Sequence, residues 1–152
     1  MSLFFAAKPD LGVNPELPES ENLASDHSCR PRAFQGHIDE MTLNNQSFRK
    51  VLYTSKYTQL VLMNLMPSEV IDREIHFTVD QFFRVESGSI TIQVEDPDEM
   101  LQASDGWAII IPAKTYHTVT AGPKGAKLYT LYSPPNHPYD RIQDEKPSSD
   151  DE

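Results

Sequence analysis

Short runs of alternating apolar and polar residues dominate the chain between residues 48 and 132. A period of two places alternate side chains on opposite faces of a strand, whereas a helix repeats its apolar positions every three or four residues. Turn-forming residues separate these runs, as in Met66-Pro67-Ser68 and Asp105-Gly106. The pattern predicts no helix and nine short strands: 48–54, 59–65, 71–76, 81–86, 89–95, 100–103, 107–111, 117–120 and 127–132. It indicates an all-β antiparallel sandwich or barrel of jelly-roll type.

The two ends of the chain differ from this middle region. Four prolines lie between residues 8 and 32 with little hydrophobic periodicity, and residues 143–152 contain five acidic residues and one lysine. Polar, charged segments of this kind bury too little apolar surface to offset the entropy of ordering. We therefore expect a Pro-rich, extended or disordered leader over 1–30, a barrel over 31–142 and a disordered acidic tail over 143–152.

Charge and cysteine content limit the classes of partner. The formal net charge is -10, and no basic face with interleaved aromatic residues is apparent, so we do not expect nucleic-acid binding. No apolar run approaches the about 20 residues of a membrane helix, and residues 1–7 lack the basic start of a secretory signal. The single cysteine, Cys29, cannot form an internal disulfide, which suits a reducing compartment. We expect a cytoplasmic protein that binds a small-molecule ligand and no membrane.

Four side chains have the spacing of a metal site built from separate hairpins. Glu74 and His76 are two residues apart, so both point to the same face of a strand and reach one ion. After a turn, Gln81 returns on the next strand, and His117 follows a later apolar run and turn. Two imidazoles, one carboxylate and one amide oxygen leave a divalent ion with a net site charge of about +1. Zn, Ni, Mn and Fe all accept this ligand set.

Two motifs around these residues resemble those of cupins. The first reads Glu74-x-His76, four residues, Gln81, six residues and Gly88. The second reads Gly106, five residues, Pro112, one residue, Lys114, two residues and His117. Cupins usually have His-x-His and then Glu in the first motif, and glycine and a final asparagine in the second. The departures of this chain are Glu74, Gln81, Lys114 and Ala121.

The resemblance extends over about residues 31–139. It implies a cupin-type antiparallel double-stranded β-helix, the jelly-roll barrel. The stretches 80–86 and 128–135 are similar to those of small single-domain cupins that are often labelled mannose-6-phosphate isomerase-like. Because the cupin fold supports many unrelated activities, the function must be argued from the site.

Three classes of function remain open at this point. The first is a metal-dependent, isomerase-like enzyme acting on a small polar substrate such as a sugar or sugar phosphate, with Glu74, Tyr116 or a bound water moving protons. The second is an Fe(II) dioxygenase that binds iron through His76, His117 and Glu74. The third is a non-catalytic metal- or ligand-binding module, or a structural component of an assembly. Because nine strands in an open barrel leave unpaired edges, we also expect a homodimer.

Overall fold

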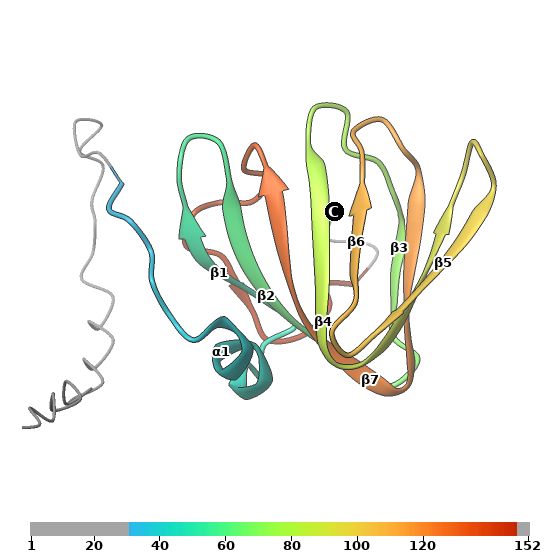
Figure 1. Cartoon of the computed structure of the whole chain (residues 1–152), viewed down its shortest axis with the longest axis horizontal. Coiled ribbons are helices and arrows are strands. Elements are labelled where there is room, and N and C mark those ends of the chain that lie inside the picture. Colours follow the sequence, from blue (N-terminus) through green and yellow to red (C-terminus); the bar gives the residue numbers. More distant parts are fainter. Residues whose placement is uncertain (1–30, 149–152) are drawn as a thin grey trace, which may run out of the picture. The chain divides into compact units, whose positions relative to one another are not determined.

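The computed structural model describes residues 31–148, and the expected leader with Cys29 lies outside the described residues. In chain order the elements are α1 (Ile38–Asn44), β1 (Arg49–Thr54), β2 (Gln59–Leu65), β3 (Val70–Glu74), β4 (Asp80–Val94), β5 (Glu99–Ser104), β6 (Ala108–Ile111), β7 (His117–Ser133) and β8 (Ile142–Gln143). Every pairing between these strands is antiparallel. The sheet folds back on itself, with β1 and β2 in one wall and β3 and β5 in the other (Figure 1). The expectation of an all-β jelly roll is confirmed.

Two long strands, β4 and β7, run through both walls. The first part of β4 pairs with β6 and its last part with β5, while β7 pairs first with β3 and then with β2. The sequence pattern divided each of them into two strands, which is wrong. Gly88 explains the difference in β4, because its φ of +76° and its close approach to the Gly125 carbonyl leave no room for a Cβ. The strand therefore bends there without ending.

Residues 38–44 form the short helix α1, where the alternation predicted no helix. The Thr42 hydroxyl donates a hydrogen bond of 2.6 Å to the Ile38 carbonyl, and α1 contacts β7, β4 and β2. A helix of seven residues makes only about two turns, too few to establish a 3.6-residue period in the sequence. Its position on the sheet, rather than local pattern, stabilises it.

The barrel interior follows the alternation of β4. Its inward positions are at most 6% exposed: Gln81, Phe83, Val85, Ile90, Ile92 and Val94. All but Gln81 are apolar and belong to one core cluster with residues of β2 and β7, among them Met63, Val119 and Leu128. Burial of these side chains supplies the main driving force for folding. The polar Gln81 therefore needs a separate explanation.

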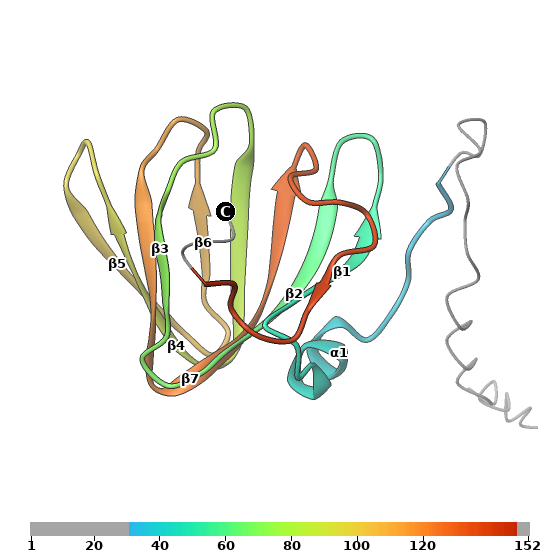
Figure 2. The ribbon, with the colours of Figure 1, turned by 180° about the vertical axis from the view of Figure 1, so that it is seen from behind.

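The chain after β7 runs back along β1, and we call residues 134–148 the C-terminal strap (Figure 2). β8 pairs with β1 through Arg49↔Gln143 and Lys50↔Ile142. The Ser47 hydroxyl donates to Asp144 at 2.9 Å, and Lys146 forms an ion pair of 2.7 Å with Asp72. The boundary expected between residues 142 and 143 thus falls inside β8. No helix among the described residues is long and apolar enough to span a membrane.

Candidate metal centre

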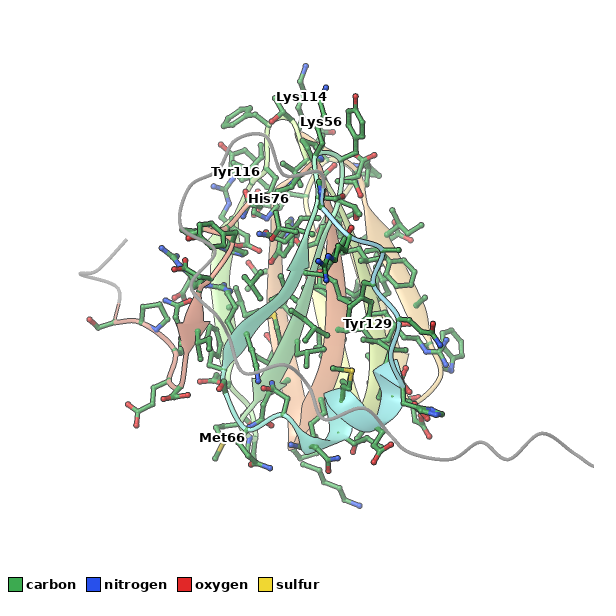
Figure 3. All side chains as sticks on the ribbon, turned by 90° about the vertical axis from the view of Figure 1, so that its left-hand side faces the viewer. Lys56, Met66, His76, Lys114, Tyr116 and Tyr129 are labelled. Atoms are coloured by element: carbon green, nitrogen blue, oxygen red, sulfur yellow. The ribbon has the colours of Figure 1, made fainter. Side chains whose placement is uncertain are left out.

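Three of the expected ligands come together at one end of the barrel. Glu74 is the last residue of β3 and pairs in register with His117, the first residue of β7. His76 lies in the loop after β3, because the strand ends two residues earlier than the pattern indicated. Figure 3 shows His76 at the same end of the molecule as Lys56, Lys114 and Tyr116, with Met66 at the opposite end.

The distances between these three side chains suit one metal ion. The Glu74 Oε1 atom lies 3.3 Å from His117 Nε2 and 3.5 Å from His76 Nε2. One ligand atom from each residue lies within 4.8 Å of the other two. Two ligands bound to a tetrahedral ion at about 2.1 Å are about 3.4 Å apart. The carboxylate and each imidazole are therefore already at the spacing that an ion requires.

The histidine rings present their Nε2 atoms to this point. The Nδ1 atom of His117 lies 3.0 Å from the Thr115 carbonyl, which can only accept, so in the neutral ring Nδ1 carries the proton and Nε2 a lone pair. The Nε2 atoms of His76 and His117 are buried without a hydrogen-bond partner. A backbone carbonyl that fixes the tautomer in this way is typical of metal-ligating histidines.

Electrostatics favour a charged carboxylate at the centre. Burial by itself would raise the pKa of Glu74, but its contacts with His117 and His76 outweigh burial and lower that pKa to about 2. Burial likewise opposes protonation of His117, yet Glu74 and the Thr115 carbonyl raise its pKa above the ordinary value. The free site is thus a carboxylate that attracts positive charge, which a proton or a cation can supply.

Gln81 lies at the start of β4, beside Tyr132 of β7. Its amide nitrogen donates to Thr130 Oγ1 at 3.2 Å and to Tyr132 Oη at 3.1 Å. Its Oε1 atom is buried and has no partner, although the side chain is only 2% exposed. The Tyr132 ring also packs edge-on against His76, with centroids 5.7 Å apart. The two hydroxyls therefore fix an amide whose oxygen has no hydrogen-bond partner, and one of these hydroxyls belongs to the tyrosine that contacts His76.

The second motif forms the turn that carries His117, despite its departure from the usual sequence. Lys114 occupies the customary glycine position with φ of +66°, and its N–H donates to the His76 carbonyl at 2.7 Å. The Ala113 N–H donates to Asp80 at 2.8 Å. The first bond joins the loops of His76 and His117 and the second ties the turn to the start of β4, so the turn forms with lysine in place of glycine. Ala121 is buried opposite Ile90.

Tyr116, the other residue expected to move protons, lies at the rim. Its ring packs against the Arg73 guanidinium, 3.6 Å from the ring centroid, and Arg73 forms a two-bond pair with Glu95. The ring contacts of the two triad histidines are with each other, Tyr132 and Phe83. Tyr116 is next to His117 in the chain, and neighbouring residues of an extended chain point in opposite directions.

Two further polar residues near the centre were not expected from the sequence. Arg49 is only 6% exposed, and His137 of the strap packs edge-on against Tyr132 with centroids 4.9 Å apart. Arg49 is two residues from the buried Val51 in β1 and therefore lies on the same face of the strand. This alternation was the signal in the sequence that could have indicated its burial. His137 lies in a Pro-rich stretch where no periodicity indicates direction.

Comparison with known proteins supports the fold and the family. A model of the cupin domain matches residues 61–132. The uncharacterized protein YrkC of Bacillus subtilis (strain 168) is 38% identical over 76% of this chain and 65% of its own length, so the match covers just under two thirds of YrkC. The uncharacterized protein L612 of Acanthamoeba polyphaga mimivirus is 40% identical over 74% of this chain and 72% of L612.

A solved structure agrees with these matches. The crystal structure of BH2720 from Bacillus halodurans superposes with a TM-score of 0.72 and 36% identity, covering 78% of this chain and 92% of that one. The sequence motifs, the jelly-roll topology and these similarities lead to one conclusion. The chain belongs to the cupin family.

Proposed function

We propose that the chain binds one divalent metal ion through Glu74, His76 and His117, with Gln81 Oε1 as the fourth ligand. The observation that carries this proposal is the set of buried polar atoms that make no hydrogen bond, namely Nε2 of both histidines, which face the Glu74 carboxylate at 3.3 and 3.5 Å, and Oε1 of Gln81. A buried polar atom without a hydrogen bond costs about 1–3 kcal/mol, so a cation that these atoms bind would stabilise the site. Zn, Ni, Mn and Fe(II) are the candidate ions.

The activity that we propose is metal-dependent chemistry on a small polar substrate such as a sugar or sugar phosphate, as in isomerase-like cupins. A bound divalent ion supplies a Lewis acid that polarises a substrate carbonyl. Glu74 is 29% exposed by side chain and is the most accessible triad member, so a substrate reaches the centre on its side. With its low pKa, Glu74 serves as a ligand, and a bound water moves the proton.

A second candidate is an Fe(II) dioxygenase, which the triad itself favours. Two histidines and one carboxylate within 4.8 Å are the ligand inventory of non-haem iron oxygenases. Iron content together with substrate-dependent O₂ uptake would select this candidate. Zinc, nickel or manganese without O₂ uptake would select the isomerase-like reading, and a chain that binds none of these ions would be a non-catalytic module.

Calorimetric titration of metal-free protein tests the proposed centre. Glu74→Gln keeps the shape of the side chain but removes the only anionic ligand, so the affinity for Zn²⁺ should fall at least about tenfold. The control is Glu99→Gln, which removes the same charge from an exposed position in β5 and should bind like wild type. Equal affinities for wild type and Glu74→Gln would overturn the ligand set.

The assembly that we propose for this function is a homodimer. Among the described strands, β5 and β6 each pair only with β4, so each leaves one edge uncovered. Unpaired edges favour association with a second copy. Light scattering of the purified protein should give twice the monomer mass of 17.2 kDa, and the monomer mass would contradict the dimer.

A further inference from the structure

Arg49 is a buried guanidinium that has no acidic partner. It lies in β1 beside Met63, points into the barrel like Val51, and is 6% exposed. Its Nη1 atom donates to the Gln143 amide oxygen at 2.8 Å, while its buried Nε–H has no partner. No carboxylate of the described residues forms an ion pair with it. Its guanidinium carbon lies 5.2 Å from the centroid of the Phe48 ring, a cation–π contact, but no negative charge of the described residues pairs with it.

His137 holds a second unsatisfied group on the same side. Its Nε2 atom is buried and lacks a partner. Gln59, which is fully buried, fixes the backbone of this residue by accepting from the His137 N–H at 2.9 Å and donating to its carbonyl at 2.8 Å. Gln59 thus fixes the backbone that carries the imidazole ring, and the Nε2 atom of this ring is buried without a hydrogen-bond partner.

Positive charges outweigh the one negative charge that acts on His137. Burial, Arg49 and Arg141 together lower its pKa to about 4, against the opposing effect of the Glu74 carboxylate. Arg141 also forms no ion pair among the described residues. Because a buried charge without an ion-pair partner costs several kcal/mol, the buried Arg49 in a chain with net charge -10 is not explained by packing.

We propose that Arg49 and His137 bind the carboxylate or phosphate group of a small organic anion, whose other polar end lies at the metal centre. The guanidinium fork matches either group with two parallel hydrogen bonds. Tyr132 lies between the proposed anion site and the metal centre, because its ring contacts both His137 and His76. β8 pairs with β1 beside Arg49, and the Gln143 amide occupies one guanidinium N–H, so the anion takes the place of Gln143 on Arg49. The inference rests on the proposed function only for the contact between the other end of the anion and the metal centre.

Calorimetry with two probe anions tests this site. Succinate and glycerol 3-phosphate are titrated into zinc-loaded and metal-free protein, which distinguishes a carboxylate from a phosphate ligand. We expect saturable binding of at least one anion, weakened at least about tenfold by Arg49→Met, since a charge-assisted bond is lost. The matched control is Lys50→Met, which removes the same charge from the exposed, outward face of the same strand and should leave anion affinity unchanged.

A second measurement keeps the test decisive if Arg49→Met does not fold. In wild-type protein, the imidazole NMR signals of His137 should shift when the probe anion is added, and those of the exposed His37 should not. No saturable binding of either anion, or binding that leaves His137 unmoved, would overturn the inference. Zinc titration of the same samples separates the two proposals, because zinc binding without anion binding contradicts only the anion site.

Discussion

At the floor of the barrel, Val85, Ile90, Ile92, Val119 and Leu128 are at most 1% exposed and belong to one hydrophobic core cluster. At the metal end, Gln81 and His117, which are at most 2% exposed, hold polar atoms that make no hydrogen bond. The same strands, β4 and β7, form both regions. The floor thus needs no further contact, because its side chains are apolar. The metal end contains buried polar atoms whose bonding partner is a ligand from outside the chain.

The largest expected effect lies at the floor. Ile92→Ala should lower the free energy of unfolding by about 2–5 kcal/mol, because the side chain is fully buried and leaves a cavity. The control is Ile110→Ala in β6, where the side chain is 64% exposed and the change should stay within about 0.5 kcal/mol. Urea denaturation measures both, and similar losses would contradict the placement of Ile92 in the core.

The next effect concerns the C-terminal strap, which covers the polar side of the interior. Ending the chain after Arg141 removes the pairing of β8 with β1 and the bonds from Gln143 and Asp144. We expect a loss of about 2 kcal/mol in the free energy of unfolding, since each net hydrogen bond contributes about 0.5–1.5 kcal/mol. Lys146→Ala removes only a surface ion pair and should cost at most about 1 kcal/mol. Unchanged stability of the truncated chain would mean that the strap does not dock.

A smaller effect is expected from the hydroxyl that orients Gln81. Tyr132→Phe leaves Gln81 bound to Thr130 alone, which should cost about 1 kcal/mol of stability. Metal affinity should fall about tenfold, because the amide oxygen is no longer held in one orientation. Tyr129→Phe, on the other face of the same strand, should change neither quantity. If Tyr132→Phe binds metal like wild type, Gln81 is not a ligand oriented by this bond.

The last expected effect is a pH dependence at His137. Its folded-state pKa is lowered from 6.5 to about 4, so the folded chain binds fewer protons than the unfolded chain between these values. The contribution of neutral His137 to stability is therefore full above pH 6.5 and is lost as the pH falls towards 4. His137→Gln should flatten this part of the stability profile. An equally steep acid loss in the variant would show that other groups cause it.

The two regions also differ in how far the sequence predicts them. Alternation alone places Phe83, Val85, Ile90 and Ile92 inside, because one face of each strand is buried and register follows from it. The same parity, with the turn residues of two motifs, brings Glu74 and His117 together from strands far apart in the chain. Local pattern sufficed wherever the strand itself determines the direction of the side chain.

What the sequence did not reveal depends on contacts between distant segments. α1 is too short for its period to be visible, and the bends of β4 and β7 follow from the meeting of Gly88 and Gly125. Arg49 is an ordinary polar strand residue until the strap covers it, and His137 is directed by Gln59 rather than by its neighbours. These residues carry the further inference, and only the three-dimensional arrangement brings them to the metal end.

The location of a bound metal tests the central claim most directly. Crystals of the protein loaded with Zn²⁺ should give one anomalous peak at the metal end, about 2.0–2.2 Å from Nε2 of His76 and His117 and from carboxylate and amide oxygens of Glu74 and Gln81. We expect this single site at full occupancy. A peak elsewhere on the molecule, or none after loading, would contradict it.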